Sequence, residues 1–166
     1  MTLDYREPRL DDGARIHRMV LEAGTLDVNS AYLYFLLSDH FRETCVVAES
    51  DSVPHELLGG FLTAYRLPRA PDTLFIWQVA VHPDWRGRGV ASGLLDALTR
   101  RTWFDDISRI ELTISPDNTA SQALFRRWAA RLERPLTVSP YLSSELLNSG
   151  QDTGHQPEDL YSIDLR

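Results

Sequence analysis

The feature that most constrains the fold is residues 79–92, where an apolar strand, a glycine-rich turn and the start of a helix follow one another. The strand ends in the apolar run 79–81, and Gly87 and Gly89 lie in the turn. Glycine has no Cβ, so its main chain can adopt positive φ and bring N–H groups close to an anion. The helix start adds the positive end of its dipole. The stretch therefore predicts a strand–loop–helix unit that binds a phosphate group.

Two arginines and the glycine spacing narrow the type of phosphate loop. Arg86 and Arg88 place positive charge in the turn. A dinucleotide loop has the pattern G-x-G-x-x-G, but the third glycine here, Gly93, comes one residue too late. A nucleotide P-loop needs a lysine, and this chain contains none. The alternative that stays open is a turn whose glycines serve packing alone.

From Arg86 through Gly89 to Ala91 the order R-x-x-G-x-A resembles the acyl-coenzyme A pyrophosphate loop of the GNAT superfamily of N-acetyltransferases. The resemblance implies acetyl-CoA as co-substrate and no metal. It also implies an α+β fold, with a central, mixed but mostly antiparallel twisted sheet of six to seven strands flanked by about four helices. The coenzyme-binding residues that it implies are Val79, Val81, Arg86, Gly87, Arg88, Gly89, Val90, Ala91, Ser92 and Asn118.

The hydrophobic periodicity predicts elements in an order that fits this fold. A first helix is capped by an aspartate near residue 12, buries Ile16, Val20 and Leu21, and ends at Gly24. The chain after Pro135 is expected to be irregular until a last strand. The expected strands cover 3–6, 44–49, 57–65, 73–81, 107–114 and 160–165. A polar turn is expected at 50–56 and a proline-bounded loop at 67–72. The later helices are expected over 33–41, over 91–102 and in a segment that starts at Asn118.

Composition limits the kind of protein. The 166 residues, 43% hydrophobic and 25% charged, suit one globular domain over residues 1–166. The net charge of -7 argues against a nucleic-acid partner, because phosphate backbones require a basic face. The chain has no apolar run near the roughly 20 residues that span a bilayer, and it does not begin like a signal peptide. We therefore expect a cytoplasmic protein without a membrane partner.

Two departures from the GNAT pattern bear on the chemistry, besides Ser121, which stands where the pattern often has Ala. The segment that starts at Asn118 resembles the motif N-x-x-A-x-x-L-Y, and Asn118 is expected either to bind the coenzyme arm or to cap a helix. Phe125 stands where many relatives carry a tyrosine that protonates the leaving thiolate, so another group or water must do so. Trp77 stands where many relatives carry a glutamate base. It is expected either to pack in the core or to line the site of an ammonium group by cation–π contact.

Three further segments, 24–34, 75–81 and 155–161, resemble the diaminobutyrate acetyltransferases, which acetylate L-2,4-diaminobutyrate on the route to the compatible solute ectoine. A substrate with two ammonium groups and a carboxylate requires acids, a donor and an apolar wall. The substrate site implied by the resemblance consists of Asp27, Asn29, Tyr32, Trp77, His155 and Glu158. Each also has a purely structural interpretation, as a cap, a packed aromatic, a solvated charge or a turn residue.

The expected reaction is acetyl transfer from acetyl-CoA to the γ-amino group of L-2,4-diaminobutyrate by direct attack in a ternary complex. Glu158 or Asp27 would order the water that deprotonates the amine. Cys45 lies in an apolar run and is a poor candidate for an acetyl carrier. The resemblance further implies a homodimer. Two alternatives stay open: the same fold acting on another small amine, and a catalytically silent acyl-CoA sensor.

Overall fold

The computed structural model describes residues 3–24, 26–50, 57–150 and 154–166. Two compact units make up the chain: Met1–Arg66 with Ile76–Asp105, and Leu67–Phe75 with Asp106–Arg166. Seven strands follow the order β1-β2-β3-β4-β5-β7-β6 in a sheet with one parallel pair. This mixed, mostly antiparallel sheet with its helices confirms the predicted α+β acetyltransferase fold.

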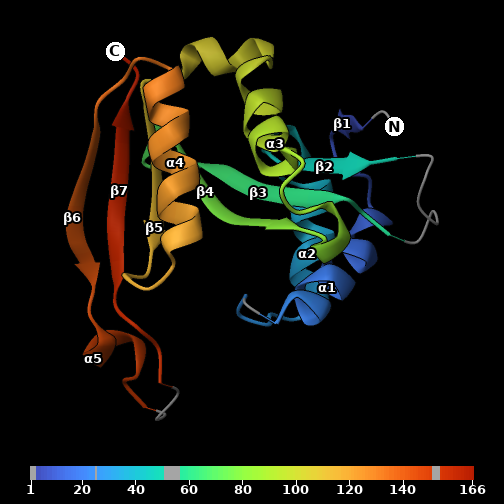
Figure 1. The fold of residues 1–166 in the computed structure, drawn as a ribbon, viewed down its shortest axis with the longest axis horizontal. Helices are drawn as coiled ribbons and strands as arrows, with labels where there is room; N and C mark the ends of the chain where they lie inside the picture. The colour runs from blue at the N-terminus through green and yellow to red at the C-terminus, as the bar shows by residue number, and fades with distance from the viewer. Residues whose placement is uncertain (1–2, 25, 51–56, 151–153) are drawn as a thin grey trace. The chain divides into compact units, whose positions relative to one another are not determined.

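The first unit begins with three antiparallel strands and two helices. Strands β1 (Asp4–Arg6), β2 (Val46–Glu49) and β3 (Gly60–Leu67) pair in order. Helices α1 (Asp12–Ala23) and α2 (Ala31–Asp39) pack side by side (Figure 1). Their contact surface belongs to a buried cluster of Ile16, Met19, Val20, Tyr34, Leu37, Cys45, Val47, Leu58 and Phe61.

Four charged side chains tie α1 to the strands of this unit. Arg6 of β1 pairs with Asp12 at 2.7 Å and with Glu49 of β2 at 2.9 Å. Arg15 of α1 pairs with the same two carboxylates, at 2.6 and 2.9 Å. Asp12 is 1% exposed, so a buried carboxylate receives two guanidinium groups and the N–H of Arg9. We call these residues, Arg6, Asp12, Arg15 and Glu49, the ion-pair ring.

The rest of the first unit carries the glycine-rich turn. The second half of β4 (Ala70–Val81) leads into a short helical turn, η2 (Pro83–Trp85), and then α3 (Val90–Thr99) and η3 (Thr102–Asp106). Helix α3 contacts β1 and β2. A Cβ on Gly93 would overlap the phenol of Tyr5, so this glycine allows β1 to approach α3.

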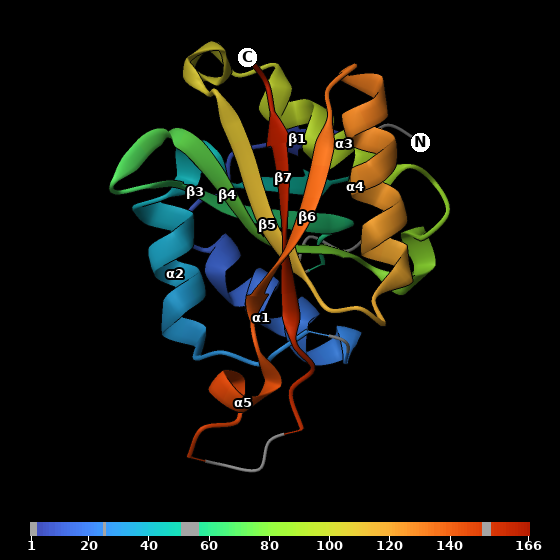
Figure 2. The same cartoon turned by 90° about the vertical axis from the view of Figure 1, so that its left-hand side faces the viewer.

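The second unit combines three strands with a long helix. The start of β4 pairs in parallel with β5 (Arg109–Ile114), and β7 (Glu158–Asp164) lies antiparallel between β5 and β6 (Leu136–Leu142), as Figure 2 shows. Helix α4 (Thr119–Arg131) places the Arg126 guanidinium 5.8 Å from the ring centre of Tyr161 on β7. A one-turn helix, α5 (Ser144–Leu147), follows β6.

Four local predictions differ, wholly or in part, from the structure. Residues 136–142, expected to be irregular, form β6; its Pro140 is tolerated because β6 is an edge strand. Leu21, expected in the core, is 53% exposed. An aspartate, Asp11, does occupy the N-cap of α1 as predicted, but its side chain makes no cap bond; the carboxylate of the next residue, Asp12, accepts from the Arg9 N–H instead. The loop at 67–72 is also shorter, with β4 starting at Ala70, and the expected turn at 50–56 lies mostly outside the described residues.

In the parts of the chain that the structure describes, no helix has both the length and the apolar character needed to cross a bilayer.

Candidate active site

The glycine-rich turn has the backbone geometry that the sequence predicts. Gly87 and Gly89 have φ of 74° and 78°, in the left-handed region where side chains are strained. A Cβ at either position would meet no atom within 4 Å. The requirement for glycine is therefore conformational, and the space beside the turn is open. Packing contacts are therefore not the reason for glycine at these two positions.

The turn delivers main-chain donors at the start of α3. Gly89 is the N-cap residue and has no side chain that could cap the helix. The Gly93 N–H donates to the Gly89 carbonyl at 2.9 Å, in the first hydrogen bond of the helix. The N–H groups of Val90, Ala91 and Ser92 precede that bond and have no acceptor within the helix. Together with the dipole of α3 they form a positive site for an anion.

Trp85 packs beside this turn, a role that was not predicted from the sequence. Its side chain is 5% exposed and lies 3.4 Å from a Cβ built on Gly59. Arg88 places its guanidinium 5.9 Å from the Trp85 ring centre, within cation–π range. The signal in the sequence was an aromatic residue directly before the arginine–glycine run.

The strand that enters the turn is held by β3. The N–H of His82 donates to the Gly59 carbonyl at 3.0 Å. A Cβ on Gly60 would lie 2.9 Å from the Ala80 carbonyl oxygen, so only glycine permits this approach. Val79 and Val81 are half-buried on the same strand.

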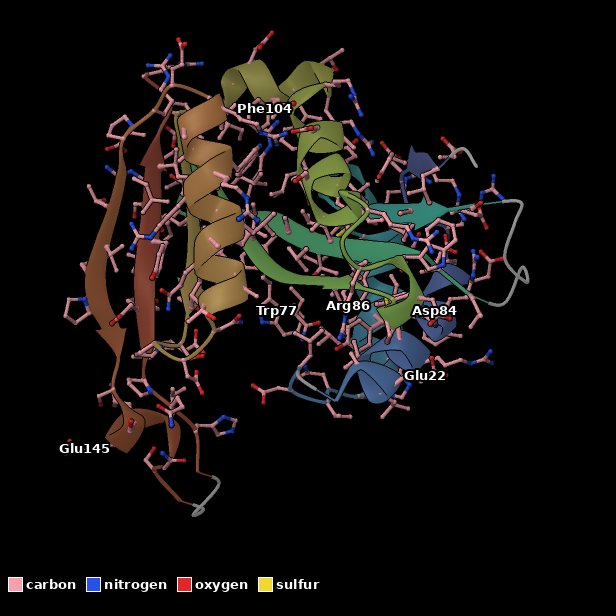
Figure 3. All side chains as sticks on the ribbon, viewed as in Figure 1. Glu22, Trp77, Asp84, Arg86, Phe104 and Glu145 are labelled. Atoms are coloured by element: carbon pink, nitrogen blue, oxygen red, sulfur yellow. The ribbon has the colours of Figure 1, made fainter. Side chains whose placement is uncertain are left out.

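Trp77 belongs to the first unit, where its half-buried side chain packs against the α1–α2 cluster. Residues 24–34, which we call the acceptor segment, contain Leu26 and Leu33. Both leucines pack against that same cluster. Figure 3 labels Trp77 on β4 and Arg86 in the turn before α3. Trp77 and these two leucines therefore pack against one buried cluster.

In the acceptor segment, Asp27 and Asn29 are not helix caps, and Tyr32 is not a packed aromatic. Ser30 caps α2 and accepts from the N–H of Tyr32 at 3.3 Å, so neither Asp27 nor Asn29 is the cap. The Asn29 amide donates to the Asp27 carbonyl at 3.2 Å. Asp27 is exposed, and Tyr32 is 70% exposed rather than packed in the helix contact.

A buried hydrogen bond fixes the strand beside Trp77, and the sequence analysis gave no sign of it. The Tyr34 hydroxyl donates to the Gln78 side-chain oxygen at 3.1 Å, and both side chains are buried. The Gln78 N–H donates to the Thr63 hydroxyl at 3.2 Å. These bonds hold α2, β3 and β4 in register around the position of Trp77.

Asn118 and Phe125 lie in the second unit. The Asn118 side chain accepts from the Ser121 N–H at 3.1 Å and so caps α4. Asn118 is exposed at the start of this helix. Phe125 is 3% exposed and packs edge-on against Trp128, with ring centres 6.3 Å apart. Phe125 is a core residue here.

His155 and Glu158 also belong to the second unit, at the entry to β7. Both are half-buried, and Glu158 pairs with Leu142 across the β6–β7 ladder. The Asn148 side chain binds the main chain of His155 on both sides, at 2.9 and 3.0 Å. Nothing in the sequence had marked Asn148 for a role.

Cys45 is buried and its thiol contacts the Ala64 carbonyl at 3.6 Å. Burial raises the pKa of the Cys45 thiol to about 12. A thiol in this setting carries almost no thiolate at neutral pH. Among the residues that the structure describes, no three His, Cys, Asp or Glu side chains cluster as a metal site would require.

Comparison of the sequence with family models and with known proteins finds acetyltransferases in both cases. The model of the acetyltransferase (GNAT) family matches residues 14–129. The chain is 44% identical to the L-2,4-diaminobutyric acid acetyltransferase of Chromohalobacter salexigens, over 98% of this chain and 81% of the relative. It is 42% identical to the enzyme of the same name from Halomonas elongata, over 97% of this chain and 80% of the relative.

A solved structure shares the fold over nearly the whole chain. It is the diaminobutyrate acetyltransferase EctA from Paenibacillus lautus, in complex with its substrate L-2,4-diaminobutyric acid and coenzyme A. The TM-score is 0.90 at 37% identity, and the match covers 98% of this chain and 95% of EctA. The chain therefore belongs to the acetyltransferase (GNAT) family and, within it, to the L-2,4-diaminobutyric acid acetyltransferases.

Proposed function

We propose that this protein transfers the acetyl group of acetyl-CoA to the γ-amino group of L-2,4-diaminobutyrate. The product is N4-acetyl-L-2,4-diaminobutyrate, for ectoine synthesis. The observation that carries the proposal is the likeness, over 98% of this chain, to an EctA structure that holds this diamine and coenzyme A. The open turn at the start of α3 supports the coenzyme half of the reaction.

In this proposal the coenzyme is bound mainly by main chain. The pyrophosphate lies against the N–H groups of residues 87–92, and Arg86 and Arg88 supply positive charge. The main chain of Val79 and Val81 binds the pantetheine arm and orients the thioester oxygen, and Asn118 binds the arm with its amide. Acetyl-CoA supplies an acetyl group already activated as a thioester.

Side chains bind the diamine. Asp27 and Glu158 bind the ammonium groups, and Trp77 forms the apolar wall and attracts positive charge through its ring. Asn29, Tyr32 and His155 supply the remaining polar contacts. The exposure of Asp27 and Tyr32 supports this use of the segment.

The amine attacks the thioester carbonyl directly, within a complex of both substrates. An alkyl ammonium has a pKa near 10, so a proton must leave before attack; water ordered by Glu158 or Asp27 accepts it. Phe125 has no proton to give, so water protonates the departing thiolate. The buried Cys45 thiol, with its raised pKa, supports a route without an acetyl-enzyme.

We also propose that residues 1–166 form one acyltransferase domain, which acts in the cytoplasm as a homodimer without nucleic-acid or membrane partners. The family match over 14–129 includes residues of both compact units, which supports one domain. The net charge of -7 opposes binding to nucleic acid.

The test is turnover with a panel of amines. The protein is mixed with acetyl-CoA and L-2,4-diaminobutyrate, a longer diamino acid, a polyamine or an aminoglycoside, and free coenzyme A is measured. We expect diaminobutyrate to give the highest kcat/KM, with NMR showing acetyl on the γ-nitrogen. A higher value for another amine would replace the substrate, and acetyl-CoA binding without turnover would favour the sensor.

A further inference from the structure

The segment that carries His155 and Glu158 is held by a side chain to which no role has been given. Asn148 lies directly after α5, in the second unit. Its side-chain oxygen accepts from the His155 N–H at 2.9 Å, and its side-chain nitrogen donates to the His155 carbonyl at 3.0 Å. The amide thus binds both main-chain groups of one residue, as a neighbouring β-strand would.

Asn148 is itself anchored on its own side of the loop. The same side-chain nitrogen donates to the Ser144 carbonyl at 2.6 Å, and the Asn148 N–H donates to that carbonyl at 2.9 Å. Both N–H donors and the oxygen of the side-chain amide are therefore used. The position of His155 is coupled in this way to α5.

The stretch from His155 to Glu158 has little freedom of its own. Pro157 fixes its φ, and a residue before proline, here Gln156, is restricted to extended conformations. At the far end, Glu158 starts β7 and pairs with Leu142, directly after a bulge between Pro140 and Leu142. Bulges of this kind redirect side chains at the ends of strands.

Both ends of this four-residue stretch are thus fixed, one by the Asn148 amide and the other by the β6–β7 ladder. Figure 2 shows α5 at the end of the β6–β7 hairpin where β7 begins. We propose that Asn148 is a positioning residue for the diamine: it holds the main chain of His155, and so sets where the His155 side chain lies relative to Glu158. This inference rests on the proposed function, in which both residues bind the diamine.

The test uses two changes at residue 148. Asn148→Ala removes the side-chain bonds to Ser144 and His155, whereas Asn148→Asp keeps the shape and the acceptor but replaces the donor with an oxygen that repels the Ser144 and His155 carbonyls. Ser149→Ala is the matched control, because the Ser149 hydroxyl donates to the Leu146 carbonyl at 2.7 Å in the same turn without touching His155.

We expect both Asn148 variants to raise KM for diaminobutyrate about tenfold, the effect of losing about one hydrogen bond between His155 and the diamine. KM for acetyl-CoA and the melting temperature should stay within the range of Ser149→Ala. A purely structural role would lower the melting temperature and move both KM values together. That result, or an unchanged KM for diaminobutyrate, would overturn the proposal.

A double-mutant cycle with His155→Ala tests whether Asn148 acts through His155. If it does, adding Asn148→Ala to His155→Ala should raise KM for diaminobutyrate less than twofold further, because the positioned side chain is already gone. Full additivity would contradict the positioning role. Wild-type turnover and the Glu158→Ala variant report separately on the proposed function, so its failure and that of Asn148 are distinguishable.

Discussion

The proposed coenzyme turn and the proposed diamine site differ in what supplies their binding groups. At the turn, two glycines in the left-handed region and the first N–H groups of α3 provide the donors, and no side chain is needed to form the anion site. The residues assigned to the diamine are side chains on the α1–α2 segment, on β4 and at the entry to β7. A backbone site depends on local conformation, whereas a side-chain site depends on how distant segments are held.

This difference predicts which mutations should weaken the binding of each substrate. Changes of charge or φ in the turn should act on acetyl-CoA alone. Changes in the side chains, or in groups such as Asn148 that hold them, should act on the diamine alone.

The ion-pair ring supports the unit that carries the turn, and we expect Asp12→Asn to lower the free energy of unfolding by about 3–5 kcal/mol. The change leaves Arg6 and Arg15, both largely buried, with one carboxylate fewer. Chemical denaturation measures the loss. Asp39→Asn is the control, since Asp39 is an exposed residue whose partner is an exposed histidine. Equal stability of the two variants would contradict the importance of the ring.

The ring also predicts a pH dependence of stability. Burial acts to raise the pKa of Asp12, but bonds from Arg6, Arg15 and the Arg9 N–H outweigh it, and the pKa is lowered. The hydrogen bond from Arg6 lowers the pKa of Glu49. A lowered carboxyl pKa stabilises the fold above the unfolded-state value and loses that effect as pH falls through the folded-state value. Below about pH 4, the free energy of unfolding should therefore decrease more steeply with falling pH in wild type than in Asp12→Asn.

In the turn, Gly89→Asp should weaken acetyl-CoA binding about a hundredfold, because a negative charge then faces the pyrophosphate and φ of 78° strains the residue. Gly89→Asn is the matched control, with nearly the same shape and strain but no charge. Arg86→Glu should act in the same direction. Calorimetric titration with acetyl-CoA measures each, and unchanged binding in Gly89→Asp would refute the assignment of the turn.

On the acceptor side, Asp27→Ala, Trp77→Ala and Glu158→Ala should each lower kcat/KM for diaminobutyrate by about ten- to a hundredfold, the range for a lost charge-assisted contact. KM for acetyl-CoA should not change. Trp77→Ala also opens the packing against the α1–α2 cluster, so melting curves must accompany its kinetics. Wild-type diamine kinetics in all three variants would remove these residues from the site.

The smallest effect is expected at Cys45. Because the thiol is buried with a raised pKa, Cys45→Ala should keep most of the activity, and initial-rate plots for the two substrates should intersect. Parallel plots with a trapped acetyl group on Cys45 would contradict direct attack. The rate should rise toward alkaline pH as more of the amine loses its proton.

The same contrast explains what the sequence could predict. The turn was predictable because positive φ, charge and a helix start are local properties of residues 86–92. Most helices and strands were predictable from hydrophobic period. The strand β6 was not, because Pro140 is acceptable only on an edge, and edge position is a property of the whole sheet.

Side-chain partners across long sequence separations were also beyond prediction. The Tyr34–Gln78 bond joins residues 44 positions apart, and nothing local marks either one. Asn148 looks like any turn asparagine until its bonds to His155 are seen. The residues assigned to the diamine could be proposed only through resemblance to a family, whereas the buried groups that hold them required the structure.

The most direct test of the contrast is a pair of calorimetric titrations on two variants, Arg86→Glu and Glu158→Ala. Coenzyme A is titrated into each protein, and diaminobutyrate is then titrated into each protein saturated with coenzyme A. We predict that Arg86→Glu weakens coenzyme A at least tenfold and leaves diaminobutyrate unchanged, and that Glu158→Ala does the reverse. If either variant weakens both ligands equally, the separation between a backbone-built coenzyme site and a side-chain-built diamine site is wrong.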